Sequence, residues 1–158
     1  DYDSRRTRQR SRPLQSTWNT EGRKTVNILF FITPKSEVSY LCEDDTLRQA
    51  LEKMELHKYS CVPLLGRDGR YVGTISEGDF LWGLKIMGFP EIPMTENIPI
   101  SNLSRRSNYR PVRVNANMED LFDRAINQNY VPVVDDDDSF IGIITRKEIL
   151  KYCYNQLN

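Results

Sequence analysis

Apolar residues recur twice along the chain with the spacing of an amphipathic helix. The two sets, each at positions i, i+3, i+4 and i+7, are Leu47, Ala50, Leu51 and Met54, and Met118, Leu121, Phe122 and Ala125. This spacing places the side chains of a set on one face of a helix. The pattern therefore predicts two helices, at about 47–54 and 118–125, that are 71 positions apart.

Each predicted helix is followed by two short apolar runs with a polar turn between them. The first copy reads CVPLL (61–65), GRDGR and YVGTIS (71–76), and the second reads YVPVV (130–134), DDDDS and FIGIIT (140–145). Runs rich in β-branched and aromatic residues, bounded by turn residues, predict a β-hairpin in each copy. Further helices are predicted at 77–87 and 146–155, and leading strands at 39–42 and 111–114.

The order strand, helix, strand, strand, helix thus occurs twice and predicts a mixed α/β (α+β) fold of two β-α-β-β-α repeats. We assign residues 26–90 to the first repeat and 91–158 to the second. Units of this size bury little surface alone, so the two repeats are expected to share a core.

Residues 1–25 differ from the rest of the chain in composition. They contain seven Lys or Arg and three Asp or Glu, a net charge of +4, in a chain whose total is zero. With almost no aliphatic residues, the segment cannot offset its ordering entropy, and we predict a flexible tail. A basic arm that binds nucleic acid without sequence preference is one interpretation. The other, which we favour, is a solvated extension.

Two phrases in the sequence resemble a known family. VGTISEGD (72–79) and IGIITRKE (141–148), after YSCVP (59–63) and NYVPV (129–133), look like the two halves of a CBS-domain pair, or Bateman module. The resemblance covers residues 28–157 and extends to small stand-alone bacterial CBS-domain proteins. It implies repeats packed about a pseudo-two-fold axis, with clefts that bind AMP, ADP, ATP, S-adenosylmethionine or cyclic di-AMP.

The start of the helix after YVGTIS has groups that suit a nucleoside phosphate. A strand ending at Ser76 and a helix with Asp79 in its first turn bring together a hydroxyl, a carboxylate and unpaired backbone N–H groups. Vicinal ribose hydroxyls can donate to the carboxylate, and the helix start favours a phosphate. The same spacing also occurs where a helix caps itself without a ligand. The duplication and the resemblance favour the nucleotide interpretation for this copy.

The second copy has Glu148 where the first has Asp79. Asp is the usual residue of the family here, so the resemblance implies ribose binding less clearly for this copy. The longer side chain is expected to make Thr145 and Glu148 a better capping box than Ser76 and Asp79.

Several cations are candidates to meet the phosphate, with ordinary exposed charges as the alternative. They are Arg146 and Lys147 at the second helix start, and Lys35, Arg105 and Arg106 on the approaches to the two repeats.

The resemblance also implies that main chain and apolar walls near the middle strands hold the adenine. The matching residues are Tyr59, Ser60, Val62 and Pro63 in the first copy, and Asn129, Tyr130, Val131 and Pro132 in the second. Packing of these residues in the core or at its rim remains an open alternative.

Other chemistry is not expected. The run 135–138 lacks the Gly and Glu of a calcium loop, and predicts a solvated acidic turn rather than a metal site. His57, the only histidine, has no nucleophile partner nearby in sequence. Three cysteines without CxxC spacing suggest neither zinc nor disulfides. We therefore expect no catalysis and no cofactor. Without an apolar run long enough for a membrane span, or a signal peptide, a cytoplasmic protein is expected.

The segment FLWGLKIMGF (80–89) is apolar on more than one side of its predicted helix. Contiguous exposed apolar surface usually marks an interface, so we predict a homodimer with Trp82 near it; local packing of Trp82 on residues 89–94 is the alternative. The favoured function is an adenine-nucleotide-sensing regulatory module that acts in trans on a target protein. The alternatives are a cyclic di-AMP receptor of the same fold, nucleic-acid binding by the tail, and a scaffold dimer without ligand.

Overall fold

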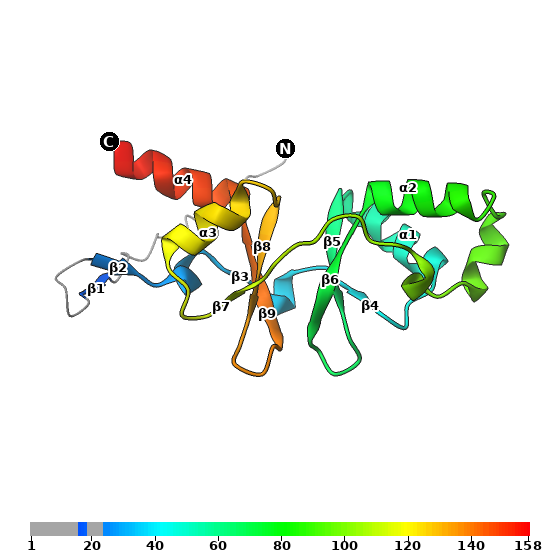
Figure 1. The fold of residues 1–158 in the computed structure, drawn as a ribbon, viewed down its shortest axis with the longest axis horizontal. Helices are drawn as coiled ribbons and strands as arrows, with labels where there is room; N and C mark the ends of the chain where they lie inside the picture. The colour runs from blue at the N-terminus through cyan, green and yellow to red at the C-terminus, as the bar shows by residue number, and fades with distance from the viewer. Residues whose placement is uncertain (1–15, 19–23) are drawn as a thin grey trace, which may run out of the picture.

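A computed structural model of the chain describes residues 16–18 and 24–158. Its two halves lie side by side, and each combines a small sheet with two helices (Figure 1). The first half contains β4 (Leu41–Cys42), α1 (Leu47–His57), β5 (Cys61–Leu65), β6 (Tyr71–Ser76) and α2 (Glu77–Ile86). The second contains β7 (Val112–Arg113), α3 (Met118–Ala125), β8 (Tyr130–Val134), β9 (Phe140–Thr145) and α4 (Arg146–Leu157). The predicted order of elements is confirmed in both copies.

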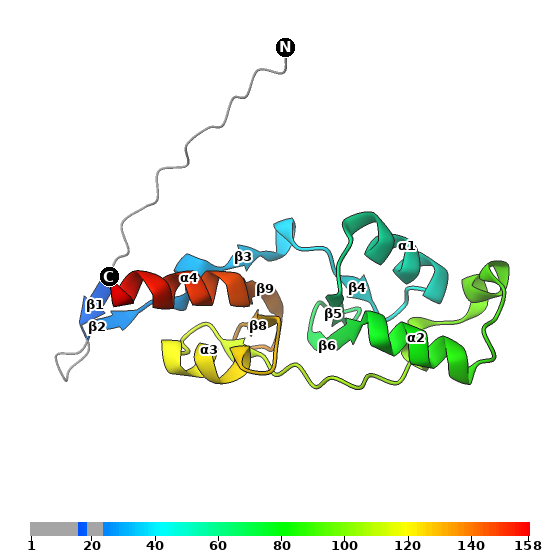
Figure 2. The same ribbon diagram turned by 90° about the horizontal axis from the view of Figure 1, so that it is seen from above.

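The two sheets share one pairing pattern. In each half the leading strand runs parallel to the strand after the helix, and the hairpin strands are antiparallel. The second sheet has a fourth strand, β3 (Thr33–Pro34), which pairs with β9. Figure 2 shows this segment leaving the second half before the chain enters the first.

The two cores exchange residues across the repeats. Ile28, in the 3₁₀ helix η1 (Ile28–Phe31), packs with Val131 and Ile144 in the core of the second half. In the opposite direction, Ile100 and Leu103 pack in the core of the first half. The predicted boundary at residue 90 thus separates the two repeats in the sequence. In the structure, each side of this boundary contributes residues to the core of the other repeat.

The hairpin turns of the two halves meet across a pseudo-two-fold axis. Tyr71 N–H donates to the Asp138 carbonyl at 3.3 Å, and Phe140 N–H donates to the Gly69 carbonyl at 3.0 Å. The two bonds are equivalent under the repeat, because Tyr71 corresponds to Phe140 and Gly69 to Asp138, with an offset of 69 in both cases. Each half therefore donates one of the two bonds and accepts the other. The rings of Tyr71 and Phe140 stack between them, with centroids 6.3 Å apart. The predicted pseudo-two-fold packing is confirmed.

Reciprocal caps fix the start of the first helix of each repeat. Thr46 and Gln49 form a capping box at α1, and Asn117 and Asp120 form one at α3. Each cap satisfies backbone N–H groups that the helix cannot pair, which is typically worth about 1 kcal/mol. Lys58 directly follows α1, and its φ of 53° lies in the left-handed region and turns the chain toward β5.

Part of the predicted tail has strand structure. Ser16–Trp18 (β1) and Lys24–Val26 (β2) form an antiparallel pair, which differs from the irregular segment expected over 1–25. The remainder of the predicted tail lies outside the described residues. Between 24 and 158, as in 16–18, no helix has the length and apolar character needed to cross a membrane.

Candidate functional site

A cleft of about 360 Å³ opens between the two halves. We call it the inter-repeat cleft; residues from both repeats and from the segment before β4 surround it. Its lining consists of Thr33, Glu37, Val38, Ser39, Lys58, Tyr59, Ser60, Cys61, Val62, Pro63, Asn129, Tyr130, Ile143 and Thr145. Cavities of this size are typical of small-molecule sites.

The inter-repeat cleft collects seven of the predicted nucleotide-site residues. From the first half these are Tyr59 and Ser60, directly before β5, and Val62 and Pro63 within it; from the second half they are Asn129, Tyr130 and Thr145. The Tyr59 ring is 39% exposed and stacks on the ring of His57, with centroids 5.5 Å apart. The packing of the two repeats against each other therefore brings together residues that lie far apart in the sequence.

A polar network forms one side of the inter-repeat cleft. Asn129 N–H donates to the Tyr109 hydroxyl at 2.9 Å, and the Asn129 side chain donates to Cys61 Sγ at 3.5 Å. The Tyr130 hydroxyl reaches the buried hydroxyl of Thr74. Burial raises the pKa of Tyr130, so its phenol stays protonated. This network joins the two repeats through neutral groups with satisfied hydrogen bonds.

The charged groups of the inter-repeat cleft are Lys58 and Glu37. Neither residue was a candidate from the sequence. Lys58 reaches the cleft because its backbone adopts the left-handed conformation directly after α1. A signal was present in the sequence, since Lys58 directly precedes the predicted adenine contact Tyr59.

Thr145 brings the start of α4 to the inter-repeat cleft. Its hydroxyl accepts the Glu148 N–H at 3.3 Å, whereas the Glu148 carboxylate lies 3.6 Å from Lys151 Nζ. The reciprocal half of the box does not form. The prediction that Thr145 and Glu148 would cap better than Ser76 and Asp79 is wrong, because the longer side chain is directed to a cation on its own helix.

Ser76 and Asp79 form the complete capping box at α2. The Ser76 hydroxyl accepts Asp79 N–H at 3.1 Å, and Asp79 Oδ2 accepts Ser76 N–H at 2.9 Å. Asp79 Oδ1 accepts the N–H of Arg106 at 2.9 Å, and only 1% of the residue is exposed. A ribose can reach this carboxylate only if the segment around Arg106 moves.

Further predicted site residues also lie outside the lining of the inter-repeat cleft. Arg146 Nε donates to the Ala125 carbonyl at 2.8 Å, Lys147 is exposed, and Pro132 is buried in β8. Lys35 Nζ lies 5.4 Å from the centre of the Tyr40 ring. Their ligand roles stay predictions.

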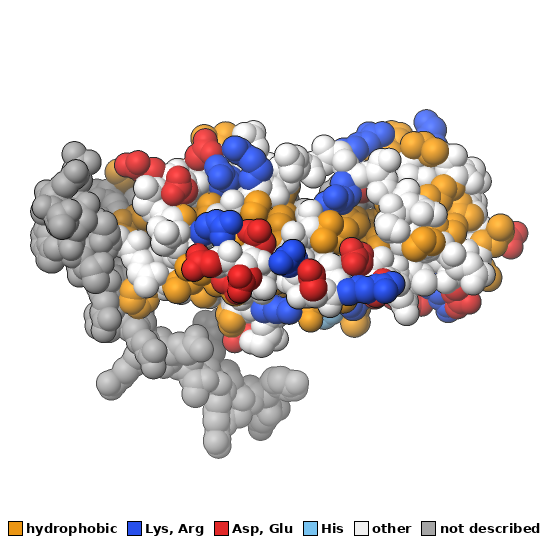
Figure 3. Space-filling view, turned by 60° about the horizontal axis from the view of Figure 1, so that its bottom comes forward, with side chains coloured by type: hydrophobic (Ala, Val, Ile, Leu, Met, Phe, Trp, Pro, Cys, Tyr) orange, Lys and Arg blue, Asp and Glu red, His pale blue; other side chains and the backbone are white. Residues whose placement is uncertain are grey.

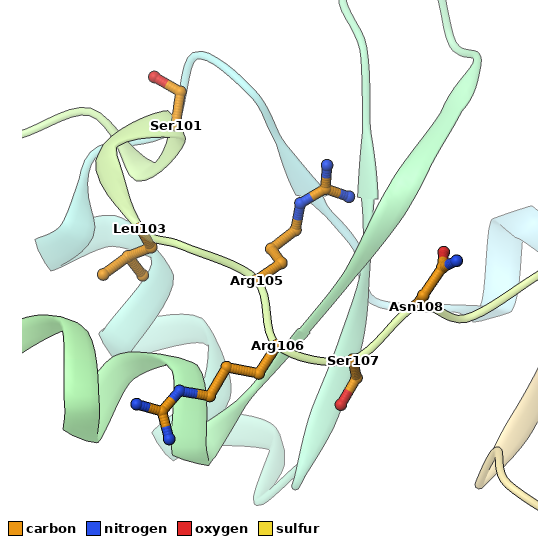
Figure 4. A pocket seen from close by; sticks show the side chains of 6 residues that line it. All are labelled: Ser101, Leu103, Arg105, Arg106, Ser107 and Asn108. Carbon is orange, nitrogen blue, oxygen red and sulfur yellow. The ribbon is translucent and has the colours of Figure 1, made fainter.

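A second cavity, of about 380 Å³, lies along the segment 101–108, which precedes β7. Its lining is Ser101, Leu103, Arg105, Arg106, Ser107 and Asn108 (Figure 4). The side chains of Arg105 and Arg106 point away from one another, so they do not converge on one anion. This geometry offers no shared phosphate position for the two arginines.

The sequence of the chain matches the family model of the CBS domain over residues 32–85 and 91–155. The chain belongs to the CBS domain family. One curated relative is the chloroplastic CBS domain-containing protein CBSX1 of Arabidopsis thaliana, 26% identical over 144 residues that cover 77% of this chain. The chain spans 61% of that relative's length.

Solved CBS-domain structures have the same fold. The crystal structure of CbpB in complex with c-di-AMP is similar with a TM-score of 0.73 and 22% identity, covering 84% of this chain and 87% of that one. The crystal structure of CBSX2 in complex with AMP is similar with a TM-score of 0.61 and 24% identity, covering 81% of this chain and 96% of that one.

Proposed function

We propose that this CBS pair is a regulatory module that senses an adenine nucleotide in the inter-repeat cleft. The observation that supports this most is the convergence of predicted adenine and ribose contacts from both repeats on one cleft of about 360 Å³. Val62, Pro63 and Ile143 form apolar walls for the base, and Tyr59 offers a ring for stacking.

The sugar and phosphate groups of the ligand have partners in the same region. Thr145 at the start of α4 faces the ribose in this proposal, and the N-terminus of α4 favours an anion. Lys58 supplies the cation for the phosphate. One lysine beside one carboxylate suits a ligand of low charge, such as AMP or one half of cyclic di-AMP, better than ATP.

The ligands of two similar proteins support this choice. CbpB has been crystallised with c-di-AMP and CBSX2 with AMP, which are both adenine nucleotides. Cyclic di-AMP is therefore the second candidate ligand for the same cleft.

We also propose that the module has no catalytic activity. The hydroxyls of Ser76 and Thr145 accept N–H groups in helix caps, and His57 stacks on Tyr59. None of these groups has the base partner that activates a nucleophile. The output then acts on a target protein, through a ligand-dependent change in how the repeats or subunits pack.

A homodimer through the helices of the first repeat completes the proposal. Leu81, Trp82 and Ile86 on α2 are 53%, 40% and 80% exposed, respectively. Figure 3 shows hydrophobic side chains over the end of the molecule that the first repeat forms. An apolar surface of this extent favours a partner.

Nucleic-acid binding is less favoured. On the face in Figure 3, acidic and basic side chains alternate along the middle of the molecule, without the single-sign stripe that a phosphate backbone attracts. Most of the basic segment 1–25 lies outside the described residues, so an arm there and the expected cytoplasmic location stay predictions.

Isothermal titration with AMP, ADP, ATP, S-adenosylmethionine, NAD and cyclic di-AMP tests the proposal. We expect AMP or cyclic di-AMP to bind, and a concentration of 100 times the dissociation constant to stabilise the fold by about 2.7 kcal/mol. Tyr59→Ala and Lys58→Ala should weaken binding about tenfold, while Lys147→Ala, a cation outside the cleft, should not. Absence of binding by the whole panel, or binding unaffected by both cleft variants, would refute the assignment.

A further inference from the structure

The segment 104–109, here called the strap, runs without regular secondary structure past the start of α2. Its Arg106 N–H donates to Asp79 Oδ1, while Asp79 Oδ2 is already used by Ser76 N–H. Both carboxylate oxygens therefore have donors from the protein, and the carboxylate is covered. A ribose hydroxyl is also a donor, so it competes with Arg106 N–H for the same oxygen.

The side chains of the strap hold it over the first repeat. Arg105 lies against Gly73, where an added Cβ would be 1.5 Å from Arg105 Nη1, and donates to the Val72 carbonyl at 2.9 Å. The Arg106 guanidinium lies 5.2 Å from the centre of the Trp82 ring on α2. The two side chains extend in different directions from the strap (Figure 4) and so attach it to β6 and to α2.

The equivalent segment of the other repeat is arranged differently. By the repeat offset of 71, Thr33–Pro34 and Lys35 match Ser104, Arg105 and Arg106. Thr33–Pro34 pairs with β9 as a strand, Lys35 lies over Tyr40, and Glu148 lies beside Lys151. The carboxylate of the second repeat therefore does not receive the bond that Asp79 receives from Arg106.

We propose that the strap is a built-in occupant of the first-repeat nucleotide site. Arg106 N–H takes the position of a ribose donor on Asp79, so this site binds nucleotide only after the strap is displaced. The inference rests on the proposed function and adds an asymmetry to it: the inter-repeat cleft is open, and the Asp79 site is closed by the chain itself.

Displacement of the strap affects two further surfaces. It removes Arg106 from Trp82, which lies on the exposed apolar face of α2. It also pulls on Tyr109, whose hydroxyl contacts Asn129 in the inter-repeat cleft. Occupation of one site is therefore coupled to the other and to the α2 surface, and such coupling is reciprocal.

Amide hydrogen exchange of the full chain without nucleotide tests the closed state. The Arg106 amide should exchange at least tenfold more slowly than the Ser107 amide, because of its bond to Asp79. The Arg110 amide, which donates to the Gln128 side chain at 2.9 Å, is a protected internal control. Equal exchange at Arg106 and Ser107, with Arg110 still protected, would overturn the strap whatever the protein binds.

Titration with AMP tests the consequence. The wild-type chain should bind one AMP tightly, and release of the strap should raise the affinity of a second site about tenfold. Arg106→Pro removes the N–H, and the double variant Arg105→Ala/Arg106→Ala keeps it but removes both side-chain anchors. Arg67→Ala, which removes an exposed cation paired with Asp44 and away from both sites, is the control. With Trp18→Phe in each protein, emission from Trp82 should change when the second site fills.

The outcomes separate the two proposals. Two equal sites in the wild type, or a single site in both strap variants, would overturn the strap and leave the proposed function intact. A wild-type chain that binds no nucleotide would refute the proposed function, and the exchange of the Arg106 amide alone would then decide whether the strap is closed.

Discussion

Gly73 and Gly142 occupy equivalent positions in β6 and β9 but lie under different neighbours. A Cβ at Gly73 would meet the guanidinium of Arg105 at 1.5 Å, whereas one at Gly142 would meet the Thr33 carbonyl oxygen at 2.3 Å. The Arg105 side chain is exposed and flexible, so it can swing away. The Thr33 oxygen belongs to the backbone of β3 and can move only if β3 separates from β9.

The free energies of unfolding should therefore differ for the same change. Gly73→Ala loses one hydrogen bond of an exposed side chain, about 1 kcal/mol, and gains about 0.5–1 kcal/mol from replacing a strand glycine. Gly142→Ala adds about 1–3 kcal/mol of overpacking and weakens the pairing of β3 with β9. We expect a net effect within about 1 kcal/mol for Gly73→Ala and a loss of about 2–4 kcal/mol for Gly142→Ala.

Urea unfolding of the two variants and the wild type measures these differences. Gly78→Ala is a control, because a Cβ there meets only Ser76 Oγ at an ordinary 3.6 Å, so it should be neutral or slightly stabilising. Equal losses at Gly73 and Gly142 would contradict the difference between a movable side chain and a fixed backbone. Since Gly73→Ala also expels Arg105, it should favour AMP binding at the Asp79 site.

Three further measurements probe other parts of the structure. Burial raises the pKa of Tyr71 and of Tyr130 above 10, so above pH 10 the folded chain binds more protons than the unfolded chain and stability falls as pH rises. Between pH 9 and 11 the free energy of unfolding should drop by about 1.4 kcal/mol in total for each tyrosine, with most of the drop above pH 10. Tyr71→Phe/Tyr130→Phe should reduce this drop, and a drop that persists in full would exclude these phenols as its source. Thr145→Ala should lower the free energy of unfolding by about 1 kcal/mol, and Ser76→Ala should lower it by more, because of these two residues only Ser76 belongs to a reciprocal capping box. Urea unfolding that ranks the two variants in the opposite order would argue against this. Ile86→Glu should convert a dimer into a monomer in analytical ultracentrifugation while Lys147→Glu should not, and a monomeric wild type would refute the dimer.

The local pattern of residues was sufficient to predict the elements. Helices, strands and hairpin turns depend on spacing, capping and turn residues that lie within a few positions of one another, and both repeats show them at the predicted places. The resemblance to the CBS family implied the pseudo-two-fold packing, and the equivalent hairpin turns do meet across this axis. The family and the residues near the middle strands followed from the same two phrases.

The state of each site depended on contacts between distant residues. Asp79 has the residue type and position expected for ribose binding, yet Arg106, 27 residues later, covers it. Lys58 enters the inter-repeat cleft because a left-handed turn directs it there, and Glu148 turns to Lys151 instead of closing its cap. Sequence by itself determined which groups are available to bind a nucleotide. Only the tertiary structure decided which of them are open to solvent, because a hydrogen-bond donor from elsewhere in the chain occupies an acceptor as effectively as a ligand does.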